Sequence, residues 1–266
     1  MKSLRSLMNL SGRVAAVTGG AGKIGAAICE ALAELGASVC IVDIAETPAA
    51  NLAGRLNREY GAPCSCVSTD LEQETAILAM AKHIASVHGQ LDILINNAAY
   101  PPTTLPADGR ALEQQSLARW EKNLRVMLTG TFLATRACVP MLRASQSAAI
   151  VNIGSIYGII GPDFDLYAGT EMQNPAFYAA SKGGILQLTR YWATTLAPTI
   201  RVNCVAPGGI WRDQPQSFVD LYNRRTPLGR MGAEEDLKGA IAFFASDLSA
   251  YVSGQVLAVD GGFTAW

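Results

Sequence analysis

A tyrosine and a lysine four residues apart, Tyr178 and Lys182, form the pair in this sequence best suited to proton transfer. On a helix, this spacing places both side chains on one face, one turn apart. A free tyrosine has a pKa near ~10 and is a poor base at neutral pH. Because an adjacent ammonium favours the phenolate, we expect Lys182 to lower the pKa of Tyr178. Ser155, at the end of a predicted strand, can then donate a hydrogen bond to a substrate oxygen.

A glycine-rich turn near the start of the chain is typical of dinucleotide binding. The run from Thr18 to Gly25 reads TGGAGKIG, with an apolar strand before it and an apolar helix after it. Glycines let a pyrophosphate approach the backbone, and the helix N-terminus presents free N–H groups to the anion. We therefore expect the cofactor phosphates to be contacted by residues of this turn, namely Gly19, Gly22, Lys23 and Ile24.

Three later strand ends carry further candidate cofactor residues. Asp43 ends the second predicted strand, where a carboxylate accepts hydrogen bonds from the adenosine ribose and repels a 2′-phosphate. This favours NAD over NADP, although Asp43 can also cap the following helix. Asp70, with its neighbour Leu71, is placed to meet the adenine. Asn97 and Ala98 follow the fourth strand and let a cofactor lie against the backbone, a role compatible with a turn that holds two strands together.

Short apolar segments alternate with longer helical patterns along the whole chain. The predicted strands are apolar on both faces, as in parallel strands covered by helices, and span 14–18, 38–43, 63–68, 91–96, 149–154, 200–205 and 256–259. The predicted helices span 24–35, 47–60, 72–87, 115–143, 176–196 and 234–246. Right-handed crossovers between such units build a doubly wound α/β domain with a mostly parallel, seven-stranded sheet flanked by helices.

We expect one domain over residues 1–266, since neither a linker nor a repeat interrupts the pattern. Three loops follow strand ends, near 100–110, 157–175 and 208–232. Ligands of open α/β sheets bind at this edge, so these loops are expected to contact the substrate.

Composition narrows the function classes. The formal net charge is −1 and the basic residues are scattered, so nucleic acid is not an expected partner. No stretch suits a signal peptide or a membrane span, which predicts a cytoplasmic protein that binds no membrane. The six cysteines lack a CxxC pair and are expected to be buried, reduced thiols. His83 and His88 lack a third ligand nearby, so no metal site is predicted.

Taken together, these residues resemble the short-chain dehydrogenase/reductase family. The resemblance runs from Arg13 to Gly262 and includes the glycine turn, NNAA at 96–99, Ser155, YAASK at 178–182, NCVAPG at 203–208, SGQ at 253–255 and DGG at 260–262. It implies a Rossmann-type oxidoreductase, a homodimer or homotetramer, that acts on the CH–OH group of a small molecule. It further implies Ser155, Tyr178 and Lys182 as catalytic residues.

The same resemblance implies further cofactor contacts. Tyr178 and Lys182 would also touch the cofactor, Lys182 through the nicotinamide ribose. The segment after the sixth strand would flank the nicotinamide with Pro207, Gly208 and Ile210.

Three positions depart from the family pattern. Lys23 stands where the short members usually have glycine, and the turn also fits the TGxxGxxG form of sugar-nucleotide epimerases and dehydratases. Met127 replaces the asparagine that normally helps hold a water for the proton relay, and Asn123, one turn earlier, is a candidate substitute. Arg212 and Asp213 occupy the neighbourhood of a threonine that often meets the carboxamide.

The segment between Ser155 and Tyr178 is longer than the family usually has. The strings YAGTEM at 167–172 and GGIWRDQP at 208–215 resemble a branch found with bacterial surface-sugar and flagellin-modification pathways. Polar, aromatic loops suit a hydroxylated, sugar-like substrate. Arg212 can pair with a phosphate or a carboxylate there, while an oligomer contact is the alternative role for this loop.

The sequence thus predicts an NAD(H)-dependent oxidoreductase that interconverts a secondary alcohol and a carbonyl. One alternative is epimerase or dehydratase chemistry, in which the hydride returns to the substrate and no net NADH accumulates. Another is a dinucleotide-binding partner protein that has lost its chemistry. Met127 and Lys23 favour this last reading, whereas the intact set of Ser155, Tyr178 and Lys182 opposes it.

Overall fold

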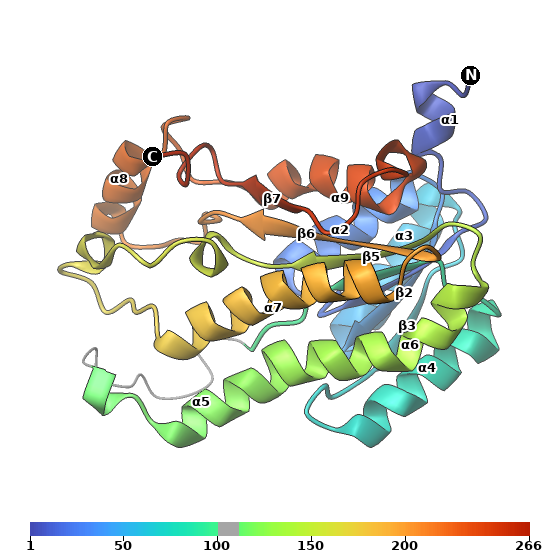
Figure 1. Ribbon diagram of the computed structural model, residues 1–266, viewed down its shortest axis with the longest axis horizontal. Coiled ribbons are helices and arrows are strands. Elements are labelled where there is room, and N and C mark those ends of the chain that lie inside the picture. Colours follow the sequence, from blue (N-terminus) through green and yellow to red (C-terminus); the bar gives the residue numbers. More distant parts are fainter. Residues whose placement is uncertain (101–111) are drawn as a thin grey trace.

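The computed structural model describes residues 1–100 and 112–266 (Figure 1). A seven-stranded, all-parallel sheet runs through the molecule in the order β3-β2-β1-β4-β5-β6-β7. Its strands are β1 (Val14–Thr18), β2 (Ser38–Asp43), β3 (Ser65–Ser68), β4 (Ile93–Asn96), β5 (Ala148–Ile153), β6 (Ile200–Pro207) and β7 (Val256–Val259). The structure confirms the predicted Rossmann-type, doubly wound sheet. The loop expected near 100–110 lies, apart from Tyr100, outside the described residues.

Helices cover both faces of the sheet (Figure 1). One face carries α2 (Lys23–Glu34), α3 (Glu46–Tyr60) and α9 (Lys238–Ala245); the other carries α4 (Glu74–His88), α6 (Thr131–Ala144) and α7 (Ala176–Thr195). Successive strand residues point to opposite faces, so each strand must be apolar on both. In β1, Ala15 and Val17 pack with the first set of helices, and Val14 and Ala16 pack with the second.

Two segments differ from the sequence-based expectation. The helix expected over 115–143 is α5 (Leu117–Leu124), a π-helical segment η2 (Arg125–Gly130) and then α6. The loop expected over 208–232 contains a helix, α8 (Gln216–Arg225). Helix α8 is polar and only ten residues long. The apolar face of so short a helix has few residues, so the hydrophobic periodicity is too weak to predict it.

The remaining elements are short. Helix α1 (Leu4–Met8) begins the chain, and 3-10 turns fill several connections, namely η1 (Leu112–Gln114), η3 (Ile156–Gly158), η4 (Phe164–Tyr167), η5 (Glu234–Leu237) and η6 (Asp247–Ser249). In the described part of the chain, no helix is both long and apolar enough to cross a membrane. Four cysteines are buried as expected, namely Cys29, Cys40, Cys138 and Cys204, while Cys64 and Cys66 are half-buried.

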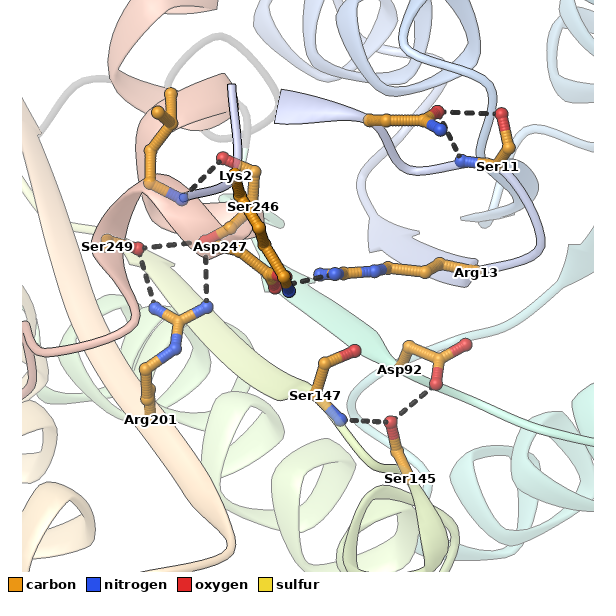
Figure 2. A network of polar contacts seen from close by, with 12 residues as sticks. Lys2, Ser11, Arg13, Asp92, Ser145, Ser147, Arg201, Ser246, Asp247 and Ser249 are labelled. Carbon is orange, nitrogen blue, oxygen red and sulfur yellow. Dashed lines mark hydrogen bonds and ion pairs between the residues drawn. The ribbon is translucent and has the colours of Figure 1, made fainter. Parts of the chain in front are cut away.

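Polar side chains fasten the amino ends of the strands, opposite the edge that carries the candidate site (Figure 2). Asp92 accepts hydrogen bonds from the Val14 amide at 2.8 Å and from the Ser145 hydroxyl at 2.5 Å. The Asp92 carboxylate therefore joins the starts of β1, β4 and β5. Arg13 pairs with Asp247 at 2.5 Å, so the chain before β1 is tied to the turn after α9. This network positions the strands and has no contact with the candidate catalytic side chains.

Candidate active site

All candidate cofactor and catalytic residues from the strands gather at the carboxyl edge of the sheet. Because the strands are parallel, every segment that leaves a strand does so at this edge. The glycine turn follows β1, Asp43 ends β2, and Asn97 follows β4. Ser155 follows β5 by two residues, and Pro207 ends β6. The sheet topology thus brings together groups that are up to about 190 positions apart in the sequence.

The glycine turn is built around two close approaches of backbone to backbone. A Cβ atom on Gly25 would stand 2.1 Å from the Gly19 oxygen, so no side chain fits there. Gly19 itself has a φ of +62°, and a Cβ on it would stand 2.8 Å from the Ala98 Cα. Asn97 holds this approach, because its Nδ2 donates to the Thr18 oxygen at 3.0 Å and to the Gly19 oxygen at 2.9 Å. The turn-holding role foreseen for Asn97 is therefore the one its side chain performs here.

Asp43 lies between the glycine turn and the start of α3. Its Oδ2 accepts from the Ala21 amide at 2.9 Å, and its Oδ1 accepts from the Ala45 amide at 2.9 Å. A carboxylate oxygen accepts more than one hydrogen bond, so each oxygen retains capacity for a ribose hydroxyl. The capping role and the cofactor role proposed for Asp43 are compatible.

The other cofactor candidates occupy varied environments around this edge. Lys23 is the exposed first residue of α2, and Ile24 behind it is half-buried. The Asp70 Oδ1 accepts from the Glu72 amide at 2.9 Å, which fixes the turn after β3. Leu71 is buried, and a Cβ on Gly130 would stand 3.0 Å from its side chain. Leu71 is thus a packing contact between this turn and the π-helical segment.

Lys182 is the most constrained of the candidate catalytic residues. Its side chain is 5% exposed, and its Nζ donates to the Ile153 oxygen at 2.8 Å. The same Nζ lies 5.8 Å from the centre of the Tyr178 ring. A Cβ on Gly158 would stand 2.8 Å from the Lys182 backbone, so the chain after β5 also presses directly on α7. These contacts fix the first two turns of α7 against the end of β5.

Ser155 and Tyr178 meet in this arrangement. Ser155 is buried, and its side chain lies near enough to the Tyr178 hydroxyl to lower the pKa of Tyr178. The Ser155 Oγ also accepts from the Tyr157 amide at 3.2 Å, which orients it at the start of η3. The structure therefore brings Ser155, Tyr178 and Lys182 into one cluster, as the sequence predicted.

The pKa values of Tyr178 and Lys182 differ from the sequence-based expectation. Burial raises the pKa of Tyr178, while the Ser155 hydrogen bond and the charge of Arg212 lower it. Burial lowers the pKa of Lys182 to about 8. In the protein alone, the lysine thus loses its charge before the phenol ionises, so the expected lowering of the Tyr178 pKa by Lys182 is wrong for this state. Desolvation disfavours both charged forms and outweighs the mutual attraction that spacing alone suggested.

Met127 is buried in the π-helical segment η2, and Asn123 is buried in α5 just before it. The Met127 oxygen accepts from the Thr131 hydroxyl at 2.9 Å, and the Asn123 Nδ2 donates to the Arg119 oxygen at 2.8 Å. The Asn123 side-chain amide therefore donates a hydrogen bond within its own helix. π-Helical turns are frequent at functional sites. The backbone around residue 127 has this form, although its side chain is that of methionine.

The long segment before Tyr178 packs through aromatic rings onto α8 and the C-terminal tail. We call this set the aromatic wall. Ring centres are separated by 6.3 Å, 5.4 Å, 5.8 Å and 4.8 Å along the series Phe164, Tyr167, Phe218, Tyr222 and Phe263. Sequence reasoning missed α8 and its two rings, because no motif marks them. Four of these rings, Tyr167, Phe218, Tyr222 and Phe263, belong to one buried hydrophobic cluster.

Two tyrosine hydroxyls are paired inside this segment. The Tyr157 and Tyr167 oxygens lie 3.0 Å apart, and the Asn174 Nδ2 donates to the Tyr167 hydroxyl at 3.3 Å. Burial raises the pKa of Tyr157 well above its usual range. Tyr167 also raises the pKa of Tyr178, which indicates that the two phenols share one environment. A tyrosine hydroxyl both donates and accepts hydrogen bonds, so this pair is suited to hydrogen bonding with substrate hydroxyls.

The segment after β6 is fastened at both ends. The Gly208 amide donates to the Val259 oxygen at 3.0 Å, and Ile210 forms a parallel bridge with Gly232. The Gly209 amide donates to the Tyr222 hydroxyl at 2.5 Å, so the aromatic wall also supports this segment. Pro207, Gly208 and Ile210 therefore form a rigid border of the site.

Comparison with known proteins gives extensive matches. A family profile described as Enoyl-(Acyl carrier protein) reductase matches residues 19–264. Cis-4-hydroxycyclohexanecarboxylate dehydrogenase from Sinomonas cyclohexanicum is 38% identical over 258 residues, which are 95% of this chain and 97% of that protein. A gluconate 5-dehydrogenase from Burkholderia cenocepacia, solved with NADP and tartrate, is 32% identical with a TM-score of 0.85, and the match covers 99% and 100% of the two chains. A short-chain dehydrogenase from Leptospira borgpetersenii with bound NAD+ is 32% identical with a TM-score of 0.84, over 99% of this chain and 96% of that one.

Gly25→Ala tests the close approach in the glycine turn. The new methyl group would meet backbone, which cannot move aside as a side chain can, so we expect a loss of about 3 kcal/mol in the free energy of unfolding. Gly22→Ala is the matched control: its φ is −70° and its nearest neighbour would be 3.4 Å away. That change should cost less than about 1 kcal/mol. Equal losses in urea denaturation would contradict the described turn.

Lys182→Met tests the buried amine through the pH dependence of stability. The folded chain holds the pKa of Lys182 at about 8, while the unfolded chain keeps the ordinary value of 10.5. Below about pH 8 both states are protonated, and the folded state bears the full cost of a buried charge. Between these two values only the unfolded state keeps the proton, so wild-type stability rises with pH by at most ~1.4 kcal/mol per unit.

The difference in unfolding free energy between Lys182→Met and wild type should therefore be constant below about pH 8 and shift in favour of wild type above it. Urea denaturation of both proteins from pH 6 to pH 10 measures this difference. A difference that stays constant across the whole range would show that the amine is not desolvated.

Proposed function

The chain belongs to the short-chain dehydrogenase/reductase family, and we propose that it transfers hydride between NAD(H) and a secondary alcohol/carbonyl pair with Tyr178 as the acid/base. Members of this family are oxidoreductases that bind a nicotinamide dinucleotide and act on alcohol or carbonyl groups of small molecules, and this chain is such an enzyme. The observation that carries the proposal is the cluster of Ser155, Tyr178 and Lys182 at the sheet edge that also holds the glycine turn.

The residues at the edge fit a dinucleotide. Gly19 and Gly25 allow backbone contacts that any Cβ would block, and the free N-terminus of α2 faces the same turn. Asp43 keeps acceptor capacity for ribose hydroxyls, which supports NAD as the cofactor. The relatives described above include one structure with NADP and one with NAD+, so this preference rests on the Asp43 carboxylate. When bound, the nicotinamide ring accepts or supplies the hydride.

Tyr178 exchanges the proton that accompanies this hydride. In the reductive direction the Tyr178 phenol donates its proton to the developing alkoxide, and in the oxidative direction the phenolate removes the proton of the substrate hydroxyl. Ser155 donates a hydrogen bond to the same substrate oxygen and orients it towards Tyr178. Lys182, a buried amine held at the Ile153 oxygen, is placed to bind the ribose and to favour the phenolate when charged.

A hydroxylated, sugar-like small molecule is the proposed substrate. The paired hydroxyls of Tyr157 and Tyr167 and the amide of Asn174 supply hydrogen-bonding groups in the segment that leads to Tyr178. The name of one relative supports this class, since that protein is a gluconate 5-dehydrogenase.

Tyr178→Phe tests the acid/base role. The protein is incubated with NAD and a panel comprising cis-4-hydroxycyclohexanecarboxylate, D-gluconate, neutral polyols and nucleotide sugars, and NADH absorbance is followed. We expect substrate-dependent NADH formation that falls by about 10²–10⁴-fold in Tyr178→Phe, because a positioned acid/base contributes that much. Tyr191→Phe, an exposed tyrosine on the same helix, is the matched control and should retain activity. Turnover without net NADH would indicate epimerase or dehydratase chemistry, and cofactor binding without turnover would indicate a partner protein.

Asp43→Asn tests the cofactor preference. The Asn side chain keeps an acceptor for only one of the Ala21 and Ala45 amides, and it loses the charge that repels a 2′-phosphate, so the ratio of kcat/KM for NAD over NADP should fall by about tenfold or more. Asp43→Ala should lower the same ratio and also lose the support of the glycine turn, seen as reduced thermal stability. If the kcat/KM ratio for NAD over NADP is unchanged in both variants, Asp43 does not determine the cofactor preference.

A further inference from the structure

Arg212 lies on a tightly fastened loop between β6 and α8. Ile210 is bridged to Gly232, and the Trp211 amide donates to the Gly232 oxygen at 2.9 Å. The Gln214 side chain closes the loop, since its Nε2 donates to the Ile210 oxygen at 2.9 Å and its Oε1 accepts from the Arg212 amide at 2.6 Å. The backbone at Arg212 therefore has one defined course.

The next residue shows backbone strain. Asp213 has a φ of 57° and is, among residues 1–100 and 112–266, the one residue other than glycine with a positive φ. Such a conformation persists only where the surroundings enforce it, and such positions cluster at ligand-binding sites. The loop therefore holds Arg212 in place at some cost in backbone energy.

The Arg212 guanidinium has only a loose partner in the described part of the chain. Its Nη2 lies 3.5 Å from the Glu234 Oε1, and that buried oxygen accepts no hydrogen bond from a described residue. Arg230, close by in the sequence, shows the contrast: it forms a fork with both oxygens of Asp236 at 2.6 Å and 2.8 Å. A guanidinium used only for structure is saturated in this way, whereas Arg212 keeps donors for a ligand.

Arg212 also lies within electrostatic reach of the reacting group. Its charge lowers the pKa of Tyr178, as does the Ser155 hydrogen bond. Arg212 and Ser155 come from the neighbouring ends of β6 and β5, which pair in parallel up to Val205 and Ile153. A substrate whose oxygen sits between Ser155 and Tyr178 would thus have its remainder near Arg212.

We propose that Arg212 binds a carboxylate group of the substrate, so that the enzyme acts on hydroxy acids or the corresponding oxo acids. The inference rests on the proposed function, and it adds the substrate class. The planar guanidinium presents paired N–H donors that match the two oxygens of a carboxylate. A monoanion fits better than a phosphate dianion, because the Glu234 carboxylate lies 3.5 Å from the Arg212 guanidinium and offsets part of its charge.

Binding of two ligands of the same shape tests this assignment without requiring turnover. Cyclohexanecarboxylate and its neutral analogue cyclohexanecarboxamide are titrated into the protein saturated with NADH, and affinity is measured by calorimetry. In wild type the carboxylate should bind at least about tenfold more tightly than the amide. Arg212→Gln should weaken carboxylate binding by about 10–100-fold and leave amide binding unchanged. Arg212→Lys keeps the charge but lacks the paired N–H donors, so its carboxylate affinity should lie between those of wild type and Arg212→Gln.

Arg224→Gln is the matched control, since Arg224 is an exposed arginine in the last turn of α8. It should leave the affinities for both ligands as in wild type. In turnover, Arg212→Gln should raise KM for cis-4-hydroxycyclohexanecarboxylate by more than it changes kcat, because the binding contact is lost whereas Tyr178 loses only the influence of the Arg212 charge on its pKa.

Three results would overturn the proposal. They are equal affinity of wild type for the carboxylate and the amide, absence of carboxylate binding to the NADH-loaded protein, and tighter binding of glucose 6-phosphate than of any carboxylate tested. Failure of the proposed function is seen separately, as absence of NADH binding or of any hydride transfer. If the protein binds NADH but Arg212→Gln leaves the carboxylate affinity unchanged, the proposed function stands and the proposed substrate class is wrong.

Discussion

The hydrogen bond from Lys182 to the Ile153 oxygen is the contact that the rest of the site depends on. It ties the second turn of α7 to Ile153, the last residue of β5. Tyr178 lies one turn before Lys182 in α7, and Ser155 lies two residues after Ile153, so this bond sets the position of Tyr178 relative to Ser155. The contact requires an amine in the protein interior, where burial lowers its pKa to about 8. The acceptor itself is fixed, because Ile153 ends β5, which is paired with β4 on one side and β6 on the other.

In the proposed function, the carboxyl edge has a cofactor half and a substrate half. At the proposed cofactor half, the Asp43 and Asn97 side chains hold a turn in which a Cβ on Gly19 or Gly25 would clash with backbone. At the second, the aromatic wall and the loop of Arg212 form a border rich in hydrogen-bonding groups. Tyr178 lies where the halves meet, and its pKa reflects both: burial raises it, and Ser155 and Arg212 lower it. The local charge pattern therefore matters to the chemistry as well as to substrate choice.

The sequence predicted the layers of the fold well, because strands that are apolar on both faces have few other solutions. It also predicted that Ser155, Tyr178 and Lys182 meet, since strand ends and helical spacing fix their positions. It missed α8 and its ring contacts with the segment before Tyr178, which depend on long-range packing between irregular segments. It also gave the wrong direction for the pKa of Tyr178, because spacing reports a neighbouring charge but not the depth at which both groups are buried.

A crystal structure of the protein with NAD bound tests the central claim most directly. The account predicts that the pyrophosphate contacts the turn of Gly19 to Ile24, that Asp43 accepts from the adenosine ribose, and that the nicotinamide ribose lies within hydrogen-bonding distance of Lys182 and Tyr178. The nicotinamide ring should pack against the segment from Pro207 to Ile210. A dinucleotide bound away from the carboxyl edge, or one whose ribose leaves Lys182 and Tyr178 without contact, would contradict it.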